Sequence, residues 1–499
     1  MRSQAIHLRL DHQSEDTYQT QLRKGLLNAI DCGSLTPELP LPSCRKFAEQ
    51  LGISRNTVAI VYQQLVNDGY VEARPKSGYY LAESVFPSST LHVDRLVVAD
   101  LPEGNPGGTG FWTGRLATRP SEFRQIEKPT DWRRFDYPFI YGQYDTGMFP
   151  LSGWRDTVRR LLRTSSDRDW LNDQVDRDDP FLVEQLRRRV LPRRGIFAGD
   201  QEVLITLGSQ NGLYLLGALL ARPGTSFGIE NPCYRDAHNI LAWHGASPVL
   251  HGIDQQGFVP NAGTADCQLL YLTPSHQVPT GIRMSEGRRR RVLDIGHRHD
   301  QILIEDDYDG DLVPGVDAPP ALKADDRAGR VVYLGSFSKA LSPGLRLGYI
   351  VADKALIDEL RSLRRLMYRH PPTGLQRQVA EFLALGHHDA LVRQLVNEAS
   401  QRREKLRAGL ETHAGLLRAL NSPDAGAFWC ELPKGADGAQ IVAEAARHGV
   451  LVEAGDSHFV SEPTPSTYLR LGYTAIPRDS IDPGIQRLAS IIERHCQDA

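Results

Sequence analysis

The chain has 499 residues, of which 40% are apolar and 24% charged, and its formal net charge is −3. This composition is typical of a globular protein with two to four folding units, and the charge gives no reason by itself to expect nucleic acid. The six cysteines form no C-x-x-C pair, no apolar leader follows Met1, and no apolar run reaches the ~18 residues of a membrane span, so free thiols and a cytoplasmic protein are expected.

The first predicted helix lies near residues 18–30. Its apolar side chains recur at spacings of three and four, which places them on one buried face. They are Tyr18, Leu22, Leu26, Ala29 and Ile30. Cys32 and Gly33 end the helix, because glycine suits the left-handed conformation that follows a helix C-terminus.

Two further helices are predicted on either side of a tight turn at Gly52 and Ile53. Ser43 and Ser54 stand before them and are suited to cap their free N–H groups. The apolar faces consist of Phe47, Ala48 and Leu51 in the first helix, and of Val58, Val61, Tyr62, Leu65 and Val66 in the second. Two helices joined by a short turn that contains glycine predict a helix-turn-helix.

The first turn of the second helix holds Arg55, Asn56 and Thr57, and in this motif that turn enters the major groove of DNA. Arginine can bridge guanine acceptors, asparagine can bridge adenine, and threonine can contact a thymine methyl group. A β-hairpin is predicted next, with strands at residues 69–73 and 79–81, and its turn can place Lys76 and the Gly78 backbone on DNA. The alternative is a small three-helix domain with surface arginines.

Residues 39–82 resemble the GntR-type winged helix without a gap, over a run that includes SCRKFAEQLGISRNTVAIVYQQLVNDGYVEARPKSGYYLA. The resemblance implies a DNA-binding domain at residues 1–83. Its contacts with double-stranded promoter DNA are assigned to Arg45, Ser54, Arg55, Asn56, Thr57, Lys76 and Gly78. Residues 84–128 are rich in glycine, proline and serine and are predicted to form a flexible linker, in which residues 91–98 are best suited to packing.

Seven short apolar runs alternate with helical stretches in the remainder, residues 129–499. They are residues 203–207, 227–230, 249–253, 269–273, 302–306, 331–336 and 347–351. This alternation predicts an α/β fold with a sheet covered on both faces. Ligands of such sheets bind at the carboxyl ends of the strands.

Polar residues follow two of these runs. Gly208 to Gly212 precede an apolar helix, and a helix N-terminus with nearby hydroxyls suits a phosphate, although a capped helix alone uses the same residues. Residues 305–309 read Glu-Asp-Asp-Tyr-Asp, and a carboxylate at the base of a pocket can keep a pyridinium nitrogen protonated. A solvated acidic loop and a magnesium site are the alternatives for the acidic run.

Lys339 follows another run, in Gly-Ser-Phe-Ser-Lys. The unperturbed pKa of lysine is ~10.4, so burial or a nearby cation must lower the pKa before the amine reacts. Ser336, Ser338 and Arg346 can hold a phosphate dianion. Together with the preceding motifs, this order predicts a pyridoxal 5'-phosphate (PLP) site, whereas Lys339 alone could be a surface lysine.

The region from residue 131 onward resembles the fold-type I, class I aminotransferases, most specifically in LTPSHQVPTGIRMS, LIEDDYDGDL and VYLGSFSKALSPGLRLGYIVA. The resemblance implies a Schiff base at Lys339, with Asp306 on the pyridine nitrogen and Tyr308 on the ring hydroxyl. It assigns the remaining contacts to Ser209, Gln210, Ser336, Ser338 and Arg346 on the phosphate, to Tyr234 on the ring face and to Arg470 on an effector carboxylate.

The two halves in this order are similar to the MocR/GabR family, to which HQVPTG and EDDYD come closest. That resemblance implies a dimeric, PLP-dependent transcription regulator that senses an amine or amino-acid effector through aldimine exchange at Lys339. Two alternatives stay open. One is an active aminotransferase with a DNA-binding appendage, and the other is a PLP-sensing regulator of vitamin B6 synthesis.

Three features depart from the patterns of these families. Val278 stands where aminotransferases have an asparagine, so one contact with the ring hydroxyl is absent. The segment before Leu186 and Arg187 lacks the usual tyrosine and glycine, which normally lend a phosphate contact to the partner subunit. Asp236 stands where GABA-sensing relatives carry arginine, which argues against GABA as the effector.

Overall fold

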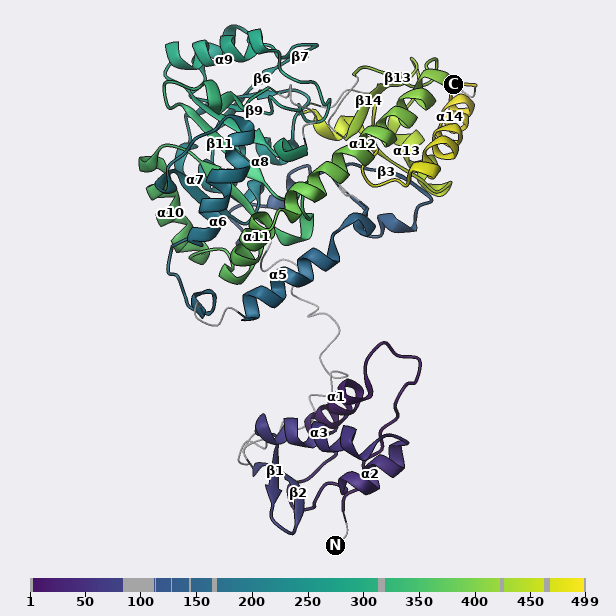
Figure 1. The fold of residues 1–499 in the computed structure, drawn as a ribbon. Coiled ribbons are helices and arrows are strands. Elements are labelled where there is room, and N and C mark those ends of the chain that lie inside the picture. Colours follow the sequence, from purple (N-terminus) through teal and green to yellow (C-terminus); the bar gives the residue numbers. More distant parts are fainter. Residues whose placement is uncertain are drawn as a thin grey trace. The chain divides into compact units, whose positions relative to one another are not determined.

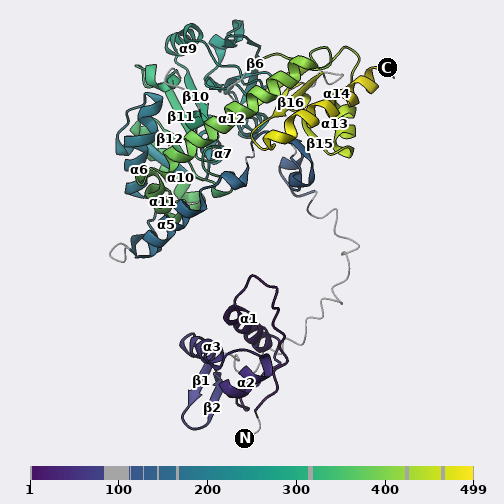
Figure 2. The same ribbon diagram turned by 45° about the vertical axis from the view of Figure 1, so that its right-hand side comes forward.

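The computed structural model describes residues 3–83, 112, 114–126, 128–142, 145–163, 168–312, 319–421, 426–461 and 467–497. The chain divides into two units, Met1–Thr118 and Arg119–Ala499, which are drawn in Figures 1 and 2. Most of the predicted linker, including residues 91–98, lies outside the described ranges. Within those ranges, every helix is too short or too polar to cross a bilayer.

The first unit contains the predicted helix-turn-helix and its hairpin. The elements are α1 (Tyr18–Asp31), α2 (Cys44–Leu51), α3 (Arg55–Asn67), β1 (Val71–Arg74) and β2 (Gly78–Leu81). Ser43 Oγ accepts a hydrogen bond from the Lys46 N–H at 3.3 Å, and Ser54 Oγ accepts from the Thr57 N–H at 3.1 Å, so both predicted caps are confirmed.

The hairpin begins two residues later than the sequence predicts. Gly69 has a φ of 79°, its N–H bonds the carbonyl of Val66, and the Tyr70 N–H bonds the carbonyl of Leu65. The N–H groups of both residues therefore close the C-terminus of α3, and only the Tyr70 carbonyl pairs across the hairpin, with the Ala82 N–H at 3.0 Å. The strands pair from Val71 opposite Leu81 to Arg74 opposite Gly78.

One apolar cluster holds the first unit together. It contains most of the predicted faces of the three helices, including Leu22, Leu26, Phe47, Val58 and Val61, each of which is buried. Tyr18, which was also predicted for the buried face of α1, is instead 39% exposed as the first residue of that helix, where its hydroxyl contacts His12 Nδ1 at 2.6 Å. Burying an apolar side chain of this size stabilises a fold by about 1.5–3 kcal/mol. The repeated spacing of apolar residues therefore reports the contact surfaces correctly.

In the second unit, all seven predicted runs join one seven-stranded sheet. Its order is β4 (Val203–Thr206), β12 (Gly348–Val351), β11 (Val331–Ser336), β10 (Ile302–Asp307), β9 (Leu269–Leu272), β5 (Ser226–Glu230) and β6 (Ser247–His251). β12 is antiparallel to both of its neighbours, so the sheet is mixed, and the strands from β11 to β6 are parallel. The run predicted at residues 249–253 is divided between β6 and β7 (Ile253–Asp254), which pairs with β8 (Gly257–Phe258).

Helices cover both faces of this sheet (Figure 1). Along β4, Val203 and Ile205 pack with α6 (Pro180–Gln185) and α11 (Thr373–Ala384), whereas Leu204 packs with helices on the other face. The latter helices are α7 (Ser209–Leu220), α8 (Arg235–Trp243) and α10 (Lys354–Tyr368). Alternation of this kind follows from the two-residue period of a strand. Two further helices, α5 (Leu151–Arg163) and α9 (Glu286–Arg298), complete the outer layers.

A second, five-stranded sheet was not predicted. Its order is β13 (Arg418–Ala419), β14 (Ala427–Glu431), β16 (Tyr468–Gly472), β15 (Val450–Ala454) and β3 (Tyr137–Phe139), and α13 (Gly438–Arg447) and α14 (Ile481–Gln497) pack on it. The long helix α12 (His387–Thr412) runs between the two sheets (Figures 1 and 2). Its Leu391 and Leu395 lie in the core of the large sheet, and its Leu406 and Leu410 lie in the core of the small one.

Candidate functional site

A pocket of about 320 Å³ opens at the carboxyl ends of the parallel strands. It is lined by all ten residues that the sequence assigns to the cofactor and the effector. These are Ser209, Gln210, Tyr234, Asp306, Tyr308, Ser336, Ser338, Lys339, Arg346 and Arg470. The position agrees with the rule for ligands of open α/β sheets.

Lys339 is a half-buried lysine three residues beyond the end of β11. Its Nζ atom lies 4.4 Å from the centroid of the Tyr141 ring. Burial, followed by the positive charges of Lys128 and Arg470, lowers the pKa of Lys339 to about 7. A substantial fraction of the side chain is therefore a neutral, nucleophilic amine at neutral pH.

Gly142 makes room for this amine. Its φ is 86°, and a Cβ atom at this position would lie 2.6 Å from Lys339 Nζ and 3.1 Å from Lys128 Nζ. Any other residue would be strained and would also collide with both amines. The two lysines thus converge on the same space, beside Gly142.

Asp306 has one carboxylate oxygen without a partner. Its Oδ2 atom accepts a hydrogen bond from the Tyr271 hydroxyl at 2.7 Å, whereas its buried Oδ1 atom has no hydrogen bond within the described residues. Burial raises the pKa of Asp306 to about 7. A buried carboxylate with an unsatisfied oxygen is suited to a cationic ring nitrogen, which would satisfy the oxygen and lower the pKa.

The neighbouring acidic residues point to other partners because side chains alternate along β10. Both Glu305 oxygens accept backbone N–H groups, from Leu322 at 2.6 Å and Lys323 at 2.9 Å. Asp307 pairs with Arg194 at 2.8 Å, and both side chains are buried. The acidic run is therefore not a solvated loop.

Donors gather at the opposite end of the pocket. Gly208 is the N-cap of α7 with a φ of 82°, and a Cβ atom there would lie 3.0 Å from Arg346 Nη2. The Ser338 N–H donates to Ser336 Oγ at 3.1 Å. A helix N-terminus, two serine hydroxyls and a guanidinium are groups suited to a doubly charged anion.

Asp236 orients two of the pocket residues. Its Oδ2 atom accepts from Gln210 Nε2 at 3.1 Å and from the Tyr234 hydroxyl at 3.2 Å. Tyr308 donates its hydroxyl to the His276 carbonyl at 2.9 Å, and Val278 lines the wall where an asparagine is usual. Asp236 therefore holds Gln210 and Tyr234 in place at the wall of the pocket.

Arg470 extends from β16 of the small sheet. It is buried, its guanidinium carbon lies 3.9 Å from the Tyr141 ring centroid, and its Nη1 atom lies 3.6 Å from Glu453 Oε2. Its Nε atom has no hydrogen bond to any described residue. Beside it, burial and then the charge of Arg470 lower the pKa of His458 to about 3, so this imidazole is neutral. Arg470 retains the capacity to bind an anion.

Several residues of the pocket were not predicted from the sequence. They are Ile126, Lys128, Tyr141, Gly142, Tyr271 and His458, and Glu453 lies behind them. Tyr141 and Gly142 follow the short apolar run of β3, so recognising that run as a strand would have drawn attention to them. Lys128 carries no such signal, because the sequence places it in the linker.

The residues assigned to DNA lie on the first unit at α2, α3 and the hairpin turn. Arg55 and Asn56 are exposed on the first turn of α3, whereas the hydroxyls of Ser54 and Thr57 bond to each other at 2.8 Å. Arg45 is exposed and pairs with Glu49 at 3.2 Å. In the turn, Lys76 and Gly78 are also exposed and have positive φ angles of 59° and 113°.

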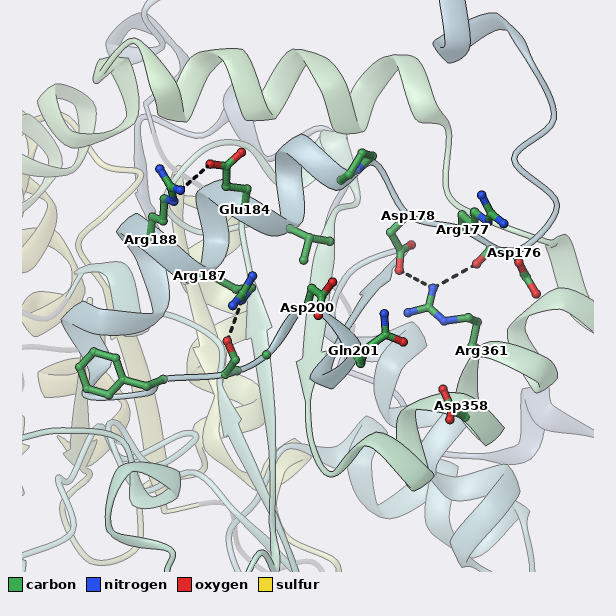
Figure 3. A pocket seen from close by; sticks show the side chains of 15 residues that line it. Asp176, Arg177, Asp178, Glu184, Arg187, Arg188, Asp200, Gln201, Asp358 and Arg361 are labelled. Carbon is green, nitrogen blue, oxygen red and sulfur yellow. Dashed lines mark hydrogen bonds and ion pairs between the residues drawn. The ribbon is translucent and has the colours of Figure 1, made fainter.

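A second hollow, of about 1150 Å³, lies on the surface beside α6 and α10 (Figure 3). Four of its charged side chains form two ion pairs with each other. Arg361 contacts Asp178 at 2.9 Å, and Arg188 contacts Glu184 at 3.1 Å. No predicted site residue lines it. This hollow therefore adds nothing to the chemistry of the pocket at Lys339.

Comparison with protein families gives two matches. Residues 19–81 match the bacterial regulatory proteins of the gntR family, and residues 142–488 match aminotransferase class I and II. The HTH-type transcriptional regulator TauR of Rhodobacter capsulatus is 35% identical over 95% of this chain and 96% of its own length. The probable rhizopine catabolism regulatory protein MocR of Rhizobium meliloti is 28% identical over 96% of this chain and 95% of its own.

Solved structures match the second unit. An archaeal alanine:glyoxylate aminotransferase superposes with a TM-score of 0.69 at 22% identity, over 77% of this chain and 99% of its own. The α-aminoadipate aminotransferase LysN of Thermus thermophilus, complexed with a phosphopyridoxyl-leucine, gives a TM-score of 0.68 at 25% identity, over 78% of this chain and all of its own. The chain therefore belongs to the MocR- and TauR-type HTH transcriptional regulators, in which a gntR-family domain precedes a fold-type I aminotransferase domain.

Proposed function

We propose that this regulator binds PLP at Lys339 and responds to a primary amine or amino acid that carries an acidic group. The observation that carries the proposal is the shared pocket of Lys339 and Arg470, with the unpartnered oxygen of Asp306 in its wall. An amine of lowered pKa is suited to the aldehyde of PLP, which also links to the amine of an effector, and a buried guanidinium is suited to the acidic group of that effector.

The residues present fit the cofactor. Asp306 would hold the ring nitrogen, Tyr308 the ring hydroxyl and Tyr234 the ring face. The phosphate would be held by Ser209, Gln210, Ser336, Ser338 and Arg346. When bound, PLP supplies an aldehyde that links covalently to primary amines, and a ring that withdraws electrons. The orphaned Oδ1 of Asp306 and the donors around Gly208 support this fit.

Each of three pocket side chains would then have a separate role. Lys339 would hold the cofactor through its amine and would be displaced from it by the amine of the effector. Arg470 takes the acidic group through its planar fork, and neutral His458 adds no competing charge. Shifting a two-state equilibrium from 1:99 to 99:1 requires differential binding of about 5.5 kcal/mol, which a covalent link and a buried ion pair can supply.

The proposal extends to organisation and partners. Residues 1–83 would bind double-stranded promoter DNA through Arg45, Ser54, Arg55, Asn56, Thr57, Lys76 and Gly78. Residues 84–128 would serve as the linker, with its end packed on the second unit, and residues 129–499 would supply the rest of the effector site. We further propose a homodimer in the cytoplasm. The family membership supports DNA binding, and the dimer is typical of the aminotransferase fold.

Borohydride reduction of the full-length, PLP-loaded protein tests the cofactor site. Peptide mass mapping should find one pyridoxyl group on the peptide that contains Lys339. The Lys339→Ala variant should carry none while its circular dichroism stays that of the wild type. A stable adduct in that variant, or an adduct on another lysine, would refute the assignment.

A panel of amines tests the response. With a DNA fragment selected by the wild-type protein from a random pool, one amine should change both the visible absorption and the DNA affinity, and the absorption should then stay constant. Consumption of the amine with release of a keto acid would instead favour an aminotransferase. If none of the amines changes the absorption, the amine-sensing function is wrong.

A further inference from the structure

The chain enters the second unit directly at the pocket. Residues 119–126 and 128, here called the strap, are the first described part of that unit and continue the segment that follows the gntR-family domain. The strap is anchored on helix α8 at two points, and its Arg124 also pairs with Asp456 at 3.4 Å. The Phe123 ring packs edge-on against Trp243 at 6.0 Å, and the Arg124 carbonyl accepts a hydrogen bond from Asn239 at 2.8 Å.

The end of the strap reaches into the pocket. Ile126 and Lys128 both line it, and Lys128 Nζ donates to the Tyr141 carbonyl at 2.5 Å. The same amine lies 3.5 Å from Glu453 Oε1, and the Lys128 side chain keeps 32% of its surface exposed. Lys128 is thus the link between the strap and the charged groups around Lys339.

Glu453 is shared by two cations. Its Oε1 atom faces Lys128 and accepts the Tyr141 N–H at 3.0 Å, whereas its Oε2 atom faces Arg470 at 3.6 Å without a hydrogen bond in the described structure. Burial favours a higher pKa for Glu453, but Lys128 and Arg470 outweigh burial and lower the pKa. Two cations around one carboxylate leave one positive charge for an incoming anion.

An anion bound to Arg470 changes the balance of charge around Glu453. Two carboxylates would then face one guanidinium in a buried site, where like charges repel strongly. Lys128 offsets the charge of Glu453 only while the strap is docked. The acid on Arg470 and the docked strap must therefore stabilise each other, because coupling between two equilibria is reciprocal.

We propose that Lys128 is the specificity-determining residue through which the acidic group of the effector is recognised and the strap is held. The inference rests on the proposed function, since it takes the effector to be an amine with an acidic group. The strap would then be the element of the second unit whose packing depends on whether an effector is bound, and it would convey that change to the residues that precede it.

Paired probes test the recognition. The PLP-loaded, full-length protein is titrated with ω-amino acids of two to five carbons and with alkylamines of the same lengths. For each length, the ratio of the two affinities gives the binding advantage that the carboxylate confers. Lys128→Met should reduce that advantage at least tenfold, about 1.4 kcal/mol, for the best pair. Arg119→Met, which removes a strap cation outside the pocket, should leave it unchanged.

Hydrogen exchange tests the strap without any ligand. Amides of residues 119–126 should exchange faster in Lys128→Met than in the wild type or in Arg119→Met. Equal exchange rates in Lys128→Met and in the wild type would overturn the proposal. It would also be overturned if the acids bound no better than the alkylamines in the wild type, or if Lys128→Met left their advantage unchanged. If no probe alters the absorption, the amine-sensing function fails, and the exchange experiment still decides the role of Lys128 in holding the strap.

Discussion

The reactivity of Lys339 depends on its surroundings more than on its neighbours in sequence. Burial and the charges of Lys128 and Arg470 lower its pKa to about 7, so its neutral form grows as the pH rises through 7. In the cofactor-free protein, acylation of Lys339 should therefore show a midpoint near 7. In the denatured chain the same lysine should titrate near ~10.4. Mass spectrometry of the Lys339 peptide across pH 5–11 measures both midpoints, and a native midpoint above 9 would contradict the argument.

Asp307, next to Asp306 in β10, forms a buried ion pair with Arg194. Arg194 Nε lies 2.8 Å from Asp307, and Asp307 also accepts from Tyr333 at 2.7 Å, all within the core. Arg194→Met would leave a buried, unpaired carboxylate, which costs about 3–5 kcal/mol. Urea unfolding followed by tryptophan fluorescence measures this cost, because residues 1–83 contain no tryptophan.

The pH dependence of that variant provides a second check. In the wild type, the charge of Arg194 outweighs burial and lowers the pKa of Asp307. Without Arg194, burial raises the pKa, so the folded protein binds a proton more readily than the unfolded chain. The loss of stability should then shrink as the pH falls. The exposed pair of Arg290 and Glu286 is the control, and Arg290→Met should cost less than about 1 kcal/mol.

At the scale of an element, the start of α3 separates stability from recognition. Ser54 Oγ caps the Thr57 N–H and bonds the Thr57 hydroxyl, whereas the exposed Arg55 follows it on the same turn. Ser54→Ala should speed amide exchange across α3 and cost about 0.5–2 kcal/mol. Arg55→Ala should leave that exchange unchanged but weaken binding to the selected DNA by about 1–3 kcal/mol. Equal effects of the two variants on exchange would contradict this division.

The two sheets show which elements a sequence can predict. The strands of the large sheet are apolar runs between helices, and each was recognised by that pattern. The small sheet was missed because its strands are short and its partners are far apart in sequence. β3 has three residues and pairs with β15 more than 300 residues later. The strand order and the antiparallel β12 also depend on tertiary packing, which no local pattern contains.

The same limit applies to the site. Residues within local motifs, such as Asp306 and Lys339, were recognised by motif, and the structure brings them together. Lys128, Tyr141 and Glu453 were missed because their role arises from contacts between segments that are remote in sequence. Such contacts become visible only when β3 and β15 lie side by side.

At the scale of the whole molecule, the pocket depends on both sheets of the second unit. Lys339 follows a strand of the large sheet, Arg470 belongs to the small sheet, and α12 contributes to both cores. A ligand that bridges Lys339 and Arg470 therefore joins the two sheets. We expect a change in their relative position to act on α12 and on the strap, which contacts α8 beside the large sheet and Glu453 of the small sheet.

Lys339→Ala should retain DNA binding but lose the dependence of that binding on the amine. The residues assigned to DNA lie at the start of α2, the start of α3 and the hairpin, and their contacts lie within the first unit, so basal affinity for the selected DNA should stay within about twofold. The amine that changes the affinity of the wild type should have no effect, because the variant cannot hold the cofactor where Arg470 also contacts the effector. Fluorescence anisotropy with and without the amine measures both quantities. An intact response in Lys339→Ala would place the sensing chemistry at another residue, whereas a loss of basal binding would mean that the cofactor site also supports the DNA-bound form.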